Sequence, residues 1–297
     1  MRQPFPLGLI EFGRRFPTDD ACRTYMRDLR WPRGFTCPEC PKGRKAYWLP
    51  SRDVLECAAC KAQITLTAGT TMHKSKTSLC TWFLGAYLQA TSTPGISALQ
   101  FQRQGRIRRY ETAFQMLHKM RAMLRQEERL SGTVEVDETY IGGYQKGAKG
   151  RGVGKATVVA AVEVRGRYAG KVRLKKIRSA SRFELHPFVY EAVMPGGTVV
   201  TDGWQQYQGL RGYRHEAIVK GELPHVHRVF SNLKTWLAGT HHGVSKKHLQ
   251  AYLNEFAFRF NRRHDVAAAF HAMLGLTTWT KGPTYRQIYS GRVAGGL

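Results

Sequence analysis

The segment Val134-Glu-Val-Asp-Glu-Thr-Tyr140 decides how the largest part of the chain folds. Its β-branched and aromatic residues favour a strand. The patterns that follow it predict strands over 156–164, 171–177, 198–201 and 217–219, and helices over 182–193, 226–237 and 245–262. Three strands in succession, then strands alternating with helices, predict a layered α/β unit.

Two acids of this unit stand at predicted strand ends. Asp137 lies near the end of the first strand, and Asp202 directly follows Val199-Val-Thr201. Carboxylates at strand ends can converge on divalent cations, and hard oxygen ligands suit Mg²⁺ or Mn²⁺. Two such ions about 3.5–4 Å apart would activate an attacking oxygen and stabilise the leaving oxygen of a phosphodiester. Either Asp alone is more simply a turn residue, but the pair indicates a metal site.

The charge of the chain indicates a polyanionic partner. Its 297 residues include 47 Lys and Arg against 21 Asp and Glu, a formal net charge of +26, while 42% hydrophobic residues suffice for packed cores. Such an excess favours nucleic acid first and an anionic membrane surface second. No run of eighteen apolar residues and no secretory signal is present, so we expect a cytoplasmic protein with no membrane partner.

Four of the six cysteines form two Cys-x2-Cys pairs, Cys37/Cys40 and Cys57/Cys60. Sixteen residues separate the pairs, a spacing typical of a zinc ribbon. Four thiolates leave no open position on the metal, so the zinc is expected to be structural. Cys22 and Cys80 lie on apolar helical stripes and are expected to pack as small hydrophobic residues.

Between the ribbon and the α/β unit, the pattern is helical. The stretch from Ile96 to Gln104, the turn residue Gly105 and a helix from Thr112 predict a helix-turn-helix. An ordinary helical hairpin is the alternative. The arginines expected to face phosphate are Arg103, Arg106, Arg108 and Arg109.

Several signatures together resemble the ISXO-like DDE transposases of bacterial insertion sequences. They are the four-cysteine ribbon, Val136-Asp-Glu-Thr-Tyr-Ile-Gly-Gly143, Thr201-Asp-Gly203, His225-Val-His-Arg-Val-Phe-Ser-Asn-Leu-Lys234 and the long run Gly239–Arg263. The resemblance implies a ribonuclease-H-like catalytic domain, and with it a multidomain α+β and α/β chain. The segments would be a helical lead-in (1–32), the zinc ribbon (33–72), a helical DNA-binding module (73–130), the transposase domain (131–265) and a C-terminal tail (266–297).

The same resemblance assigns the site residues. Asp137 and Asp202 match the first two metal-binding acids of the family. The third position, seven residues before Lys234, is His227. A neutral imidazole in place of a carboxylate favours Mn²⁺ relative to Mg²⁺, and Glu222, Asn232 and Glu255 remain alternatives. Lys234 would contact phosphate.

The implied activity is metal-dependent DNA strand cleavage and strand transfer. DNA partners would be the terminal inverted repeats and the target, with at least a homodimer joining two ends, and the protein would be associated with the nucleoid. Further basic residues expected to face DNA are Arg259, Arg262 and Arg263. The alternative is a zinc-ribbon regulator whose ribonuclease-H-like domain binds DNA without catalysis.

Overall fold

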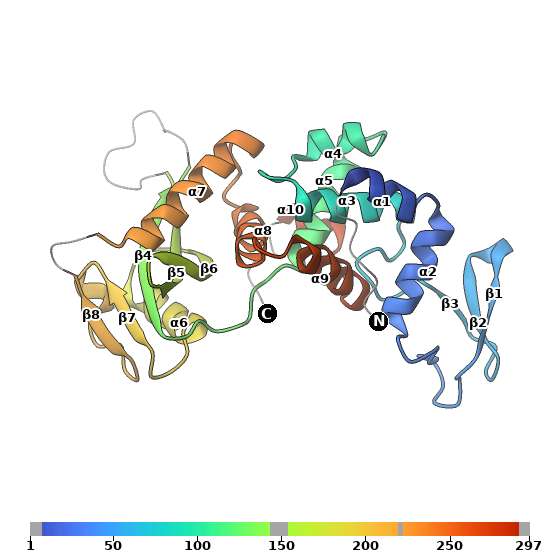
Figure 1. The fold of residues 1–297 in the computed structure, drawn as a ribbon, viewed down its shortest axis with the longest axis horizontal. Coiled ribbons are helices and arrows are strands. Elements are labelled where there is room, and N and C mark those ends of the chain that lie inside the picture. The colour runs from blue at the N-terminus through green and yellow to red at the C-terminus, as the bar shows by residue number, and fades with distance from the viewer. Residues whose placement is uncertain (1–7, 143–153, 219–221, 291–297) are drawn as a thin grey trace. The chain divides into compact units, whose positions relative to one another are not determined.

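The segment around Asp137 lies in the central strand of a five-stranded sheet (Figure 1). The computed structural model describes residues 8–142, 154–218 and 222–290. The strands are β4 (Thr133–Ile141), β5 (Ala156–Arg165), β6 (Tyr168–Ile177), β7 (Thr198–Thr201) and β8 (Arg214–Ala217), in the spatial order β6-β5-β4-β7-β8. The first three form an antiparallel meander, as the sequence predicts, and β7 and β8 extend it in parallel.

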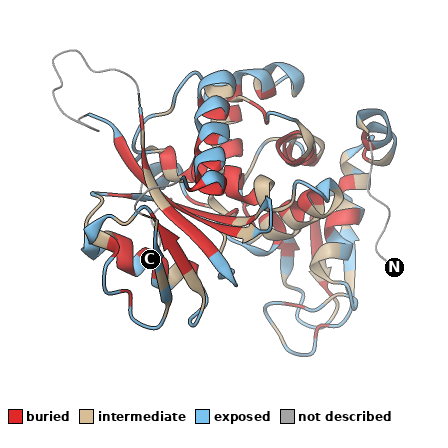
Figure 2. Ribbon diagram, turned by 60° about the vertical axis from the view of Figure 1, so that its left-hand side comes forward, coloured by how far each residue is buried: buried red, intermediate tan, exposed pale blue. Residues whose placement is uncertain are grey.

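Helices cover both faces of this sheet. Helix α6 (Arg182–Ala192) lies on one face, whereas α7 (Pro224–His241) and α8 (Leu249–Asn261) lie on the other. Alternate residues of β4 and β5 therefore enter two different cores, and both strands are buried over much of their length (Figure 2). Val136 pairs with Ala161 on the α6 side, whereas Asp137 pairs with Ala160, which belongs to the α7 and α8 core. Asp137 therefore faces α7.

Some boundaries differ from the expected ones. Strand β4 continues to Ile141, paired with Ala156, so Asp137 lies within the strand rather than near its end. The strand expected over 217–219 corresponds to β8, which lies earlier, at Arg214–Ala217, and residue 219 lies outside the described part of the chain. The last long helix of the unit starts at Leu249 rather than Ser245, because the preceding residues form a turn closed by the His248 N–H on the Ser245 carbonyl.

The chain divides into two compact units, each of which draws on two parts of the sequence. Unit 2 consists of Leu124–His264 and Arg286–Leu297 and contains the five-stranded sheet. Unit 1 consists of Met1–Met123 and Asp265–Tyr285. The elements of unit 1 are α1 (Leu9–Arg15), α2 (Asp19–Arg30), β1 (Ala46–Leu49), β2 (Val54–Cys57), β3 (Gln63–Thr65), α3 (Leu79–Thr91), α4 (Ala98–Gln104), α5 (Tyr110–Ala122) and α9 (Val266–Trp279). A short helix, α10 (Tyr285–Ser290), follows α9.

Local sequence features account for several elements of unit 1. Thr18 accepts a hydrogen bond from the Ala21 N–H and caps α2, which buries Cys22 and Met26. Strands β1, β2 and β3 form a small antiparallel sheet beside the cysteines. The apolar stripe around Trp82 and Phe83 forms α3.

The segment 266–297, expected as a tail, instead supplies a core helix. Phe270, Met273 and Leu274 of α9 are fully buried in unit 1. The Phe270 ring centroid lies 5.9 Å from that of Tyr87 on α3. The sequence obscures this role because α9 is apolar on nearly every side, so it shows no stripe of helical period. Residues 291–297 lie outside the described part of the chain.

Within the described ranges, no helix combines the length and the apolar character needed to cross a bilayer.

Candidate functional site

The four ribbon cysteines converge in unit 1. Their sulfur atoms all lie within 4.8 Å of one another, with 3.8 Å between Cys37 and Cys60 and 3.9 Å between Cys40 and Cys57. Four sulfurs bound tetrahedrally at about 2.3 Å from one ion would lie about 3.8 Å apart. The cluster therefore has the dimensions of a four-thiolate zinc site, and it fits structural zinc as the spacing predicts.

Backbone hydrogen bonds favour the thiolate form of one of these cysteines, Cys57, whereas neighbouring thiols raise the pKa of Cys60 to about 12. Hydrogen bonds from the N–H groups of Cys60 and Ala59 lower the pKa of Cys57 to about 7. A thiol with this pKa is about half ionised at neutral pH, and the thiolate is the form that binds metal.

A glycine that the sequence analysis did not single out closes the cluster. A Cβ atom on Gly43 would lie 2.4 Å from Cys37 Cβ and 2.6 Å from Cys57 Sγ, closer than nonbonded atoms approach. The Gly43 carbonyl also accepts the Cys37 N–H at 2.9 Å. The signal in the sequence was a glycine three residues after the second cysteine.

In unit 2, parallel pairing brings the two predicted acids together. Glu135 pairs with Val200 in the β4 and β7 register. Continuing that register by two residues places Asp137 beside Asp202, just past the end of β7. Each carboxylate is oriented by a nearby N–H: Asp137 accepts from Glu138 at 2.8 Å and Asp202 from Trp204 at 3.0 Å. Gly203 adopts φ +81°, which lets the chain turn sharply after Asp202.

The raised pKa of Asp137 indicates that the carboxylates lack a neighbouring positive charge strong enough to stabilise them. Burial raises the pKa of Asp137, and the neighbouring Asp202 charge raises it further. The Glu138 N–H and His227 oppose this change, but the pKa remains above the usual range for an aspartate. A divalent cation would relieve the unfavourable burial and repulsion of these carboxylates.

His227 reaches this pair from α7. Its Nε2 lies 3.2 Å from Asp137 Oδ2, and the imidazole is 53% exposed, so it remains accessible to a ligand. The other candidates for a third ligand lie in different surroundings. Glu222 is exposed ahead of α7, Asn232 is exposed on it, and Glu255 is fully buried on α8. Lys234 is exposed on α7, two turns after His227.

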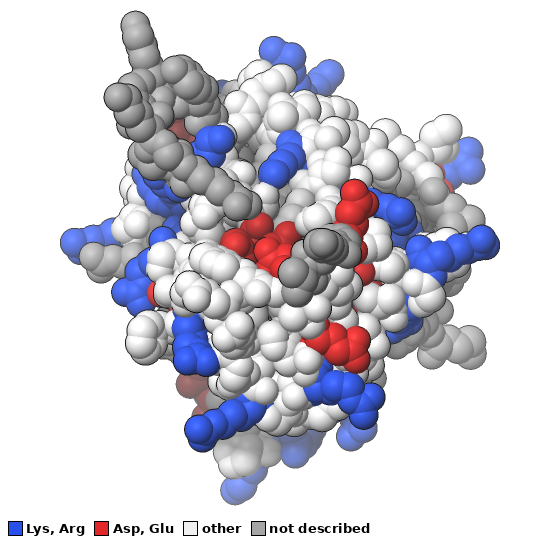
Figure 3. All heavy atoms as spheres, turned by 90° about the vertical axis from the view of Figure 1, so that its left-hand side faces the viewer, with Lys and Arg blue, Asp and Glu red and all other residues white. Residues whose placement is uncertain are grey.

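A buried tyrosine lies beside this group, and the sequence analysis did not identify it. The Tyr207 hydroxyl donates to Glu138 Oε2 at 2.8 Å. Burial raises the pKa of Tyr207 well above its ordinary value, and the charges of Glu138, Asp137 and Asp202 act in the same direction. Tyr207 therefore stays protonated and remains a donor. On the face of the molecule in Figure 3, acidic side chains gather near the centre, with Lys and Arg around them.

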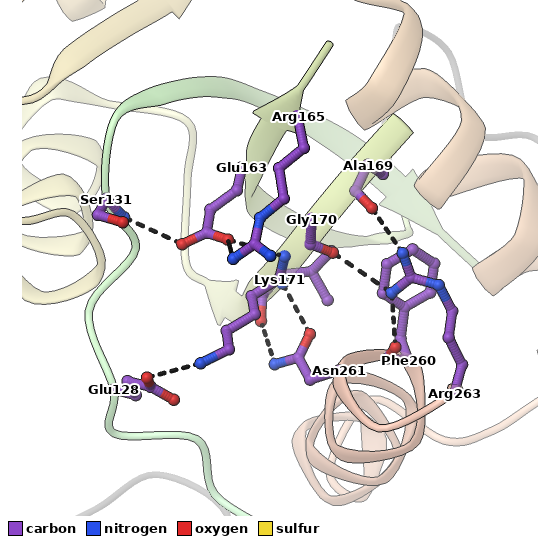
Figure 4. Close-up of polar contacts among 11 residues, drawn as sticks. Glu128, Ser131, Glu163, Arg165, Ala169, Gly170, Lys171, Phe260, Asn261 and Arg263 are labelled. Carbon is purple, nitrogen blue, oxygen red and sulfur yellow. Dashed lines mark hydrogen bonds and ion pairs between the residues drawn. The ribbon is translucent and has the colours of Figure 1, made fainter. Parts of the chain in front are cut away.

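The arginines predicted to face DNA fall into two groups. Arg103, Arg106, Arg108 and Arg109 are exposed around the connection from α4 to α5. The arginines at the end of α8 are engaged inside unit 2. Arg262 lies over the Phe258 ring and donates to Gln126, while Arg263 lies over Phe260 and donates to the carbonyls of Ala169 and Gly170 (Figure 4). Arg259 and Arg262 are half-buried, whereas Arg263 is exposed, so the expectation that these three face DNA stays a prediction.

The fold and these two sites define a zinc-ribbon protein with a carboxylate-bearing α/β domain. Residues 129–261 match a family model described as an ISXO2-like transposase domain, and residues 17–63 match one described as a transposase zinc-ribbon domain. Both matches are to transposase domains, and the resemblance seen in the sequence is confirmed. Searches among curated proteins and among solved structures find no match.

Proposed function

We propose that this chain is an active DDE-type transposase, which cuts the ends of its insertion sequence and joins the freed 3′-hydroxyl groups to target DNA. The observation that carries the proposal is the meeting of Asp137, Asp202 and His227 within an ISXO2-like transposase domain. A ribonuclease-H-like fold for unit 2 is supported by its antiparallel meander, its two parallel strands and its helices on both faces.

The donor set fits a divalent cation. Two carboxylates and one imidazole suit Mn²⁺ and, with less preference, Mg²⁺. Asp137, Asp202 and His227 would hold it, and the metal would supply Lewis-acid activation of the attacking and leaving oxygens. Lys234, on the same helix as His227, would bind a phosphate of the DNA strand. The Tyr207 hydroxyl donates to Glu138, which follows Asp137 on β4 and points to the opposite face of the sheet.

DNA recognition would fall to unit 1. The exposed arginines between α4 and α5 would bind backbone phosphates of the terminal inverted repeats, and their exposure supports this role. The zinc ribbon would help select the ends. Joining two ends in one complex requires at least two copies of the chain.

The decisive experiment separates cleavage from binding. Full-length, zinc-loaded protein is incubated with duplexes that carry the inverted repeats flanking its gene, with Mg²⁺ or Mn²⁺. Asp137→Asn and Asp202→Asn should each lower strand cleavage at least a hundredfold and leave end binding within about twofold, because the amide keeps the shape but removes the charge that holds the metal. Asp28→Asn, at an exposed position in unit 1, serves as the matched control.

His227 is tested in the same assay. His227→Ala should abolish cleavage, whereas His227→Glu should retain or raise Mg²⁺-dependent cleavage. Full activity of His227→Ala would exclude it as a ligand. Wild-type protein that binds the ends but never cuts them would favour the regulator instead.

A further inference from the structure

A buried carboxylate of the sheet holds the first turn of α7. Glu135 on β4 is only 5% exposed. Its Oε2 accepts hydrogen bonds from the backbone N–H groups of His225 and Val226, each at 2.9 Å. Its Oε1 lies 2.6 Å from His225 Nδ1, which donates because an ionised carboxylate only accepts.

Together with one helical hydrogen bond, these contacts provide an acceptor for each backbone N–H of residues 225–227. Pro224 occupies the first helical position and has no N–H. The N–H groups of His225 and Val226 have no helical partner, and Leu223 provides no capping side chain. The His227 N–H makes the first regular helical bond, to the Leu223 carbonyl. Glu135 therefore acts as the N-terminal cap of α7 from another element, and the helix dipole helps to offset its buried charge.

The same contacts set the distance between α7 and β4 next to the carboxylate site. Glu135 and Asp137 are two residues apart on β4, so they point to the same face of the sheet. On α7, His227 directly follows Val226. The helix turn fixed by Glu135 is therefore the turn that brings His227 Nε2 to 3.2 Å from Asp137 Oδ2.

We propose that Glu135 is a positioning residue, which clamps the N-terminus of α7 to β4 and so holds His227 in place as the third metal ligand. This inference rests on the proposed function, because it gives His227 that role. Outer partners that orient a ligand typically change metal affinity about 10- to 100-fold.

Glu163 offers a matched control in the same sheet. It is 4% exposed and accepts hydrogen bonds from the backbone N–H groups of Ser131 and Lys171, both at 3.1 Å (Figure 4). Its contacts tie β5 to β6 and to the start of β4, and among the described residues none of them involves α7. Glu163→Ala therefore removes a comparable buried carboxylate without releasing His227.

The first measurement is hydrogen–deuterium exchange of the full-length, zinc-loaded protein without added Mg²⁺ or Mn²⁺. Glu135→Ala should accelerate exchange of the amides at 225–228 at least tenfold, because two of them lose their acceptor. Glu135→Gln should change exchange less, since its Oε1 can still accept both N–H groups. Glu163→Ala should leave α7 unchanged. If the start of α7 exchanges alike in the wild type and Glu135→Ala, the proposal is wrong.

The second measurement is Mn²⁺ affinity, read by titration with electron paramagnetic resonance. Glu135→Ala should weaken Mn²⁺ binding about tenfold, and Glu163→Ala less than twofold. In a His227→Ala background, the effect of Glu135→Ala should disappear, because Glu135 acts through His227. An undiminished tenfold effect in that background, or an equal loss in Glu163→Ala, overturns the positioning role.

The two measurements distinguish this inference from the function on which it rests. Absence of Mn²⁺ binding by the wild type contradicts the proposed metal site, whatever the exchange data show. Normal Mn²⁺ binding by the wild type together with unchanged binding in Glu135→Ala leaves the metal site standing and removes Glu135 from it.

Discussion

Gly43 is the position at which a single added methyl group would disturb the thiolate cluster most directly. We expect Gly43→Ala to displace Cys37 and Cys57, because its Cβ would lie within 2.6 Å of both side chains. The purified variant should bind less than about half an equivalent of zinc, measured by metal analysis, since distorted ligand geometry weakens a structural site. Gly13→Ala, which meets open space on α1, is the control. One full equivalent of zinc in Gly43→Ala would show that the loop adapts.

Asp137 should destabilise the protein in the absence of its metal. Burial and the Asp202 charge keep its pKa higher in the folded chain than in the unfolded chain. The ionised form of such an acid lowers the free energy of unfolding. This loss is absent at pH values below the pKa of the unfolded chain and complete above the pKa of the folded chain. Asp137→Asn should therefore raise the thermal midpoint by a few degrees at pH 7 without added Mg²⁺ or Mn²⁺. The gain should vanish near pH 3, below the ordinary aspartate pKa, whereas an equal gain at both pH values would exclude ionisation as its cause.

The sequence was sufficient for residues whose role depends on local spacing. The cysteine pairs follow from the chain alone, because each knuckle is a short turn. Asp137 and Asp202 were predicted from expected strand ends and from the resemblance, and the register of β4 and β7 brings the two together, although Asp137 lies within its strand. Glu135 was not identified, since its role depends on contacts with His225 and Val226, 90 and 91 residues away. A buried acid beside apolar strand residues was the available signal.

At the scale of elements, α8 covers an edge of the sheet. β6 is the outer strand, and its outward backbone groups would otherwise be open to pairing with another chain. Asn261 accepts the Val172 N–H at 2.8 Å and donates to the Val172 carbonyl at 3.1 Å. Gln250 likewise accepts a hydrogen bond from the Lys176 N–H and donates one to the Leu174 carbonyl. Two amide side chains of one helix thus replace a neighbouring strand.

Asn261→Ala should open this edge. Removing both hydrogen bonds should lower the free energy of unfolding by about 1–3 kcal/mol, because two backbone groups lose their partner. Chemical denaturation measures that change, and light scattering should detect self-association through the exposed strand. Asn232→Ala, at an exposed position on α7, is the matched control. Unchanged stability of Asn261→Ala would indicate that water replaces the amide at no cost.

The order of elements was predictable, but the use of the α8 side chains was not. Periodic apolar residues identified α8 and its core face. The arginines at its end were expected to face DNA because a basic chain binds nucleic acid. Arg262 and Arg263 also contact aromatic rings and carbonyl groups within unit 2, which the sequence did not predict. Sequence periodicity gives the direction of a side chain but not the backbone carbonyls that it can reach.

At the scale of the whole molecule, the chain leaves unit 1 after Met123 and returns to it at Asp265. The zinc ribbon and the helical segment therefore share a unit with α9, which lies beyond the whole α/β unit in the sequence. Thr71 shows the same connection, since its N–H donates to the Thr277 carbonyl at 3.0 Å. We expected consecutive segments because no local sequence pattern indicates that the chain comes back to unit 1 at Asp265.

This arrangement predicts that a substitution near the C-terminal end weakens unit 1 and leaves unit 2 intact. Phe270 is fully buried, with ring contacts to Phe12, Phe16 and Tyr87. Phe270→Ala should cost about 3–5 kcal/mol, the range for removing a buried phenyl group. Hydrogen–deuterium exchange should then show faster exchange in α3 and α2, whereas β4 and β5 keep their protection. Phe183→Ala, at a 90% exposed position on α6, is the control. Faster exchange in β4 and β5 of the Phe270→Ala protein would mean that the two units unfold together, and a zinc-ribbon unit closed by α9 would then have no stability of its own.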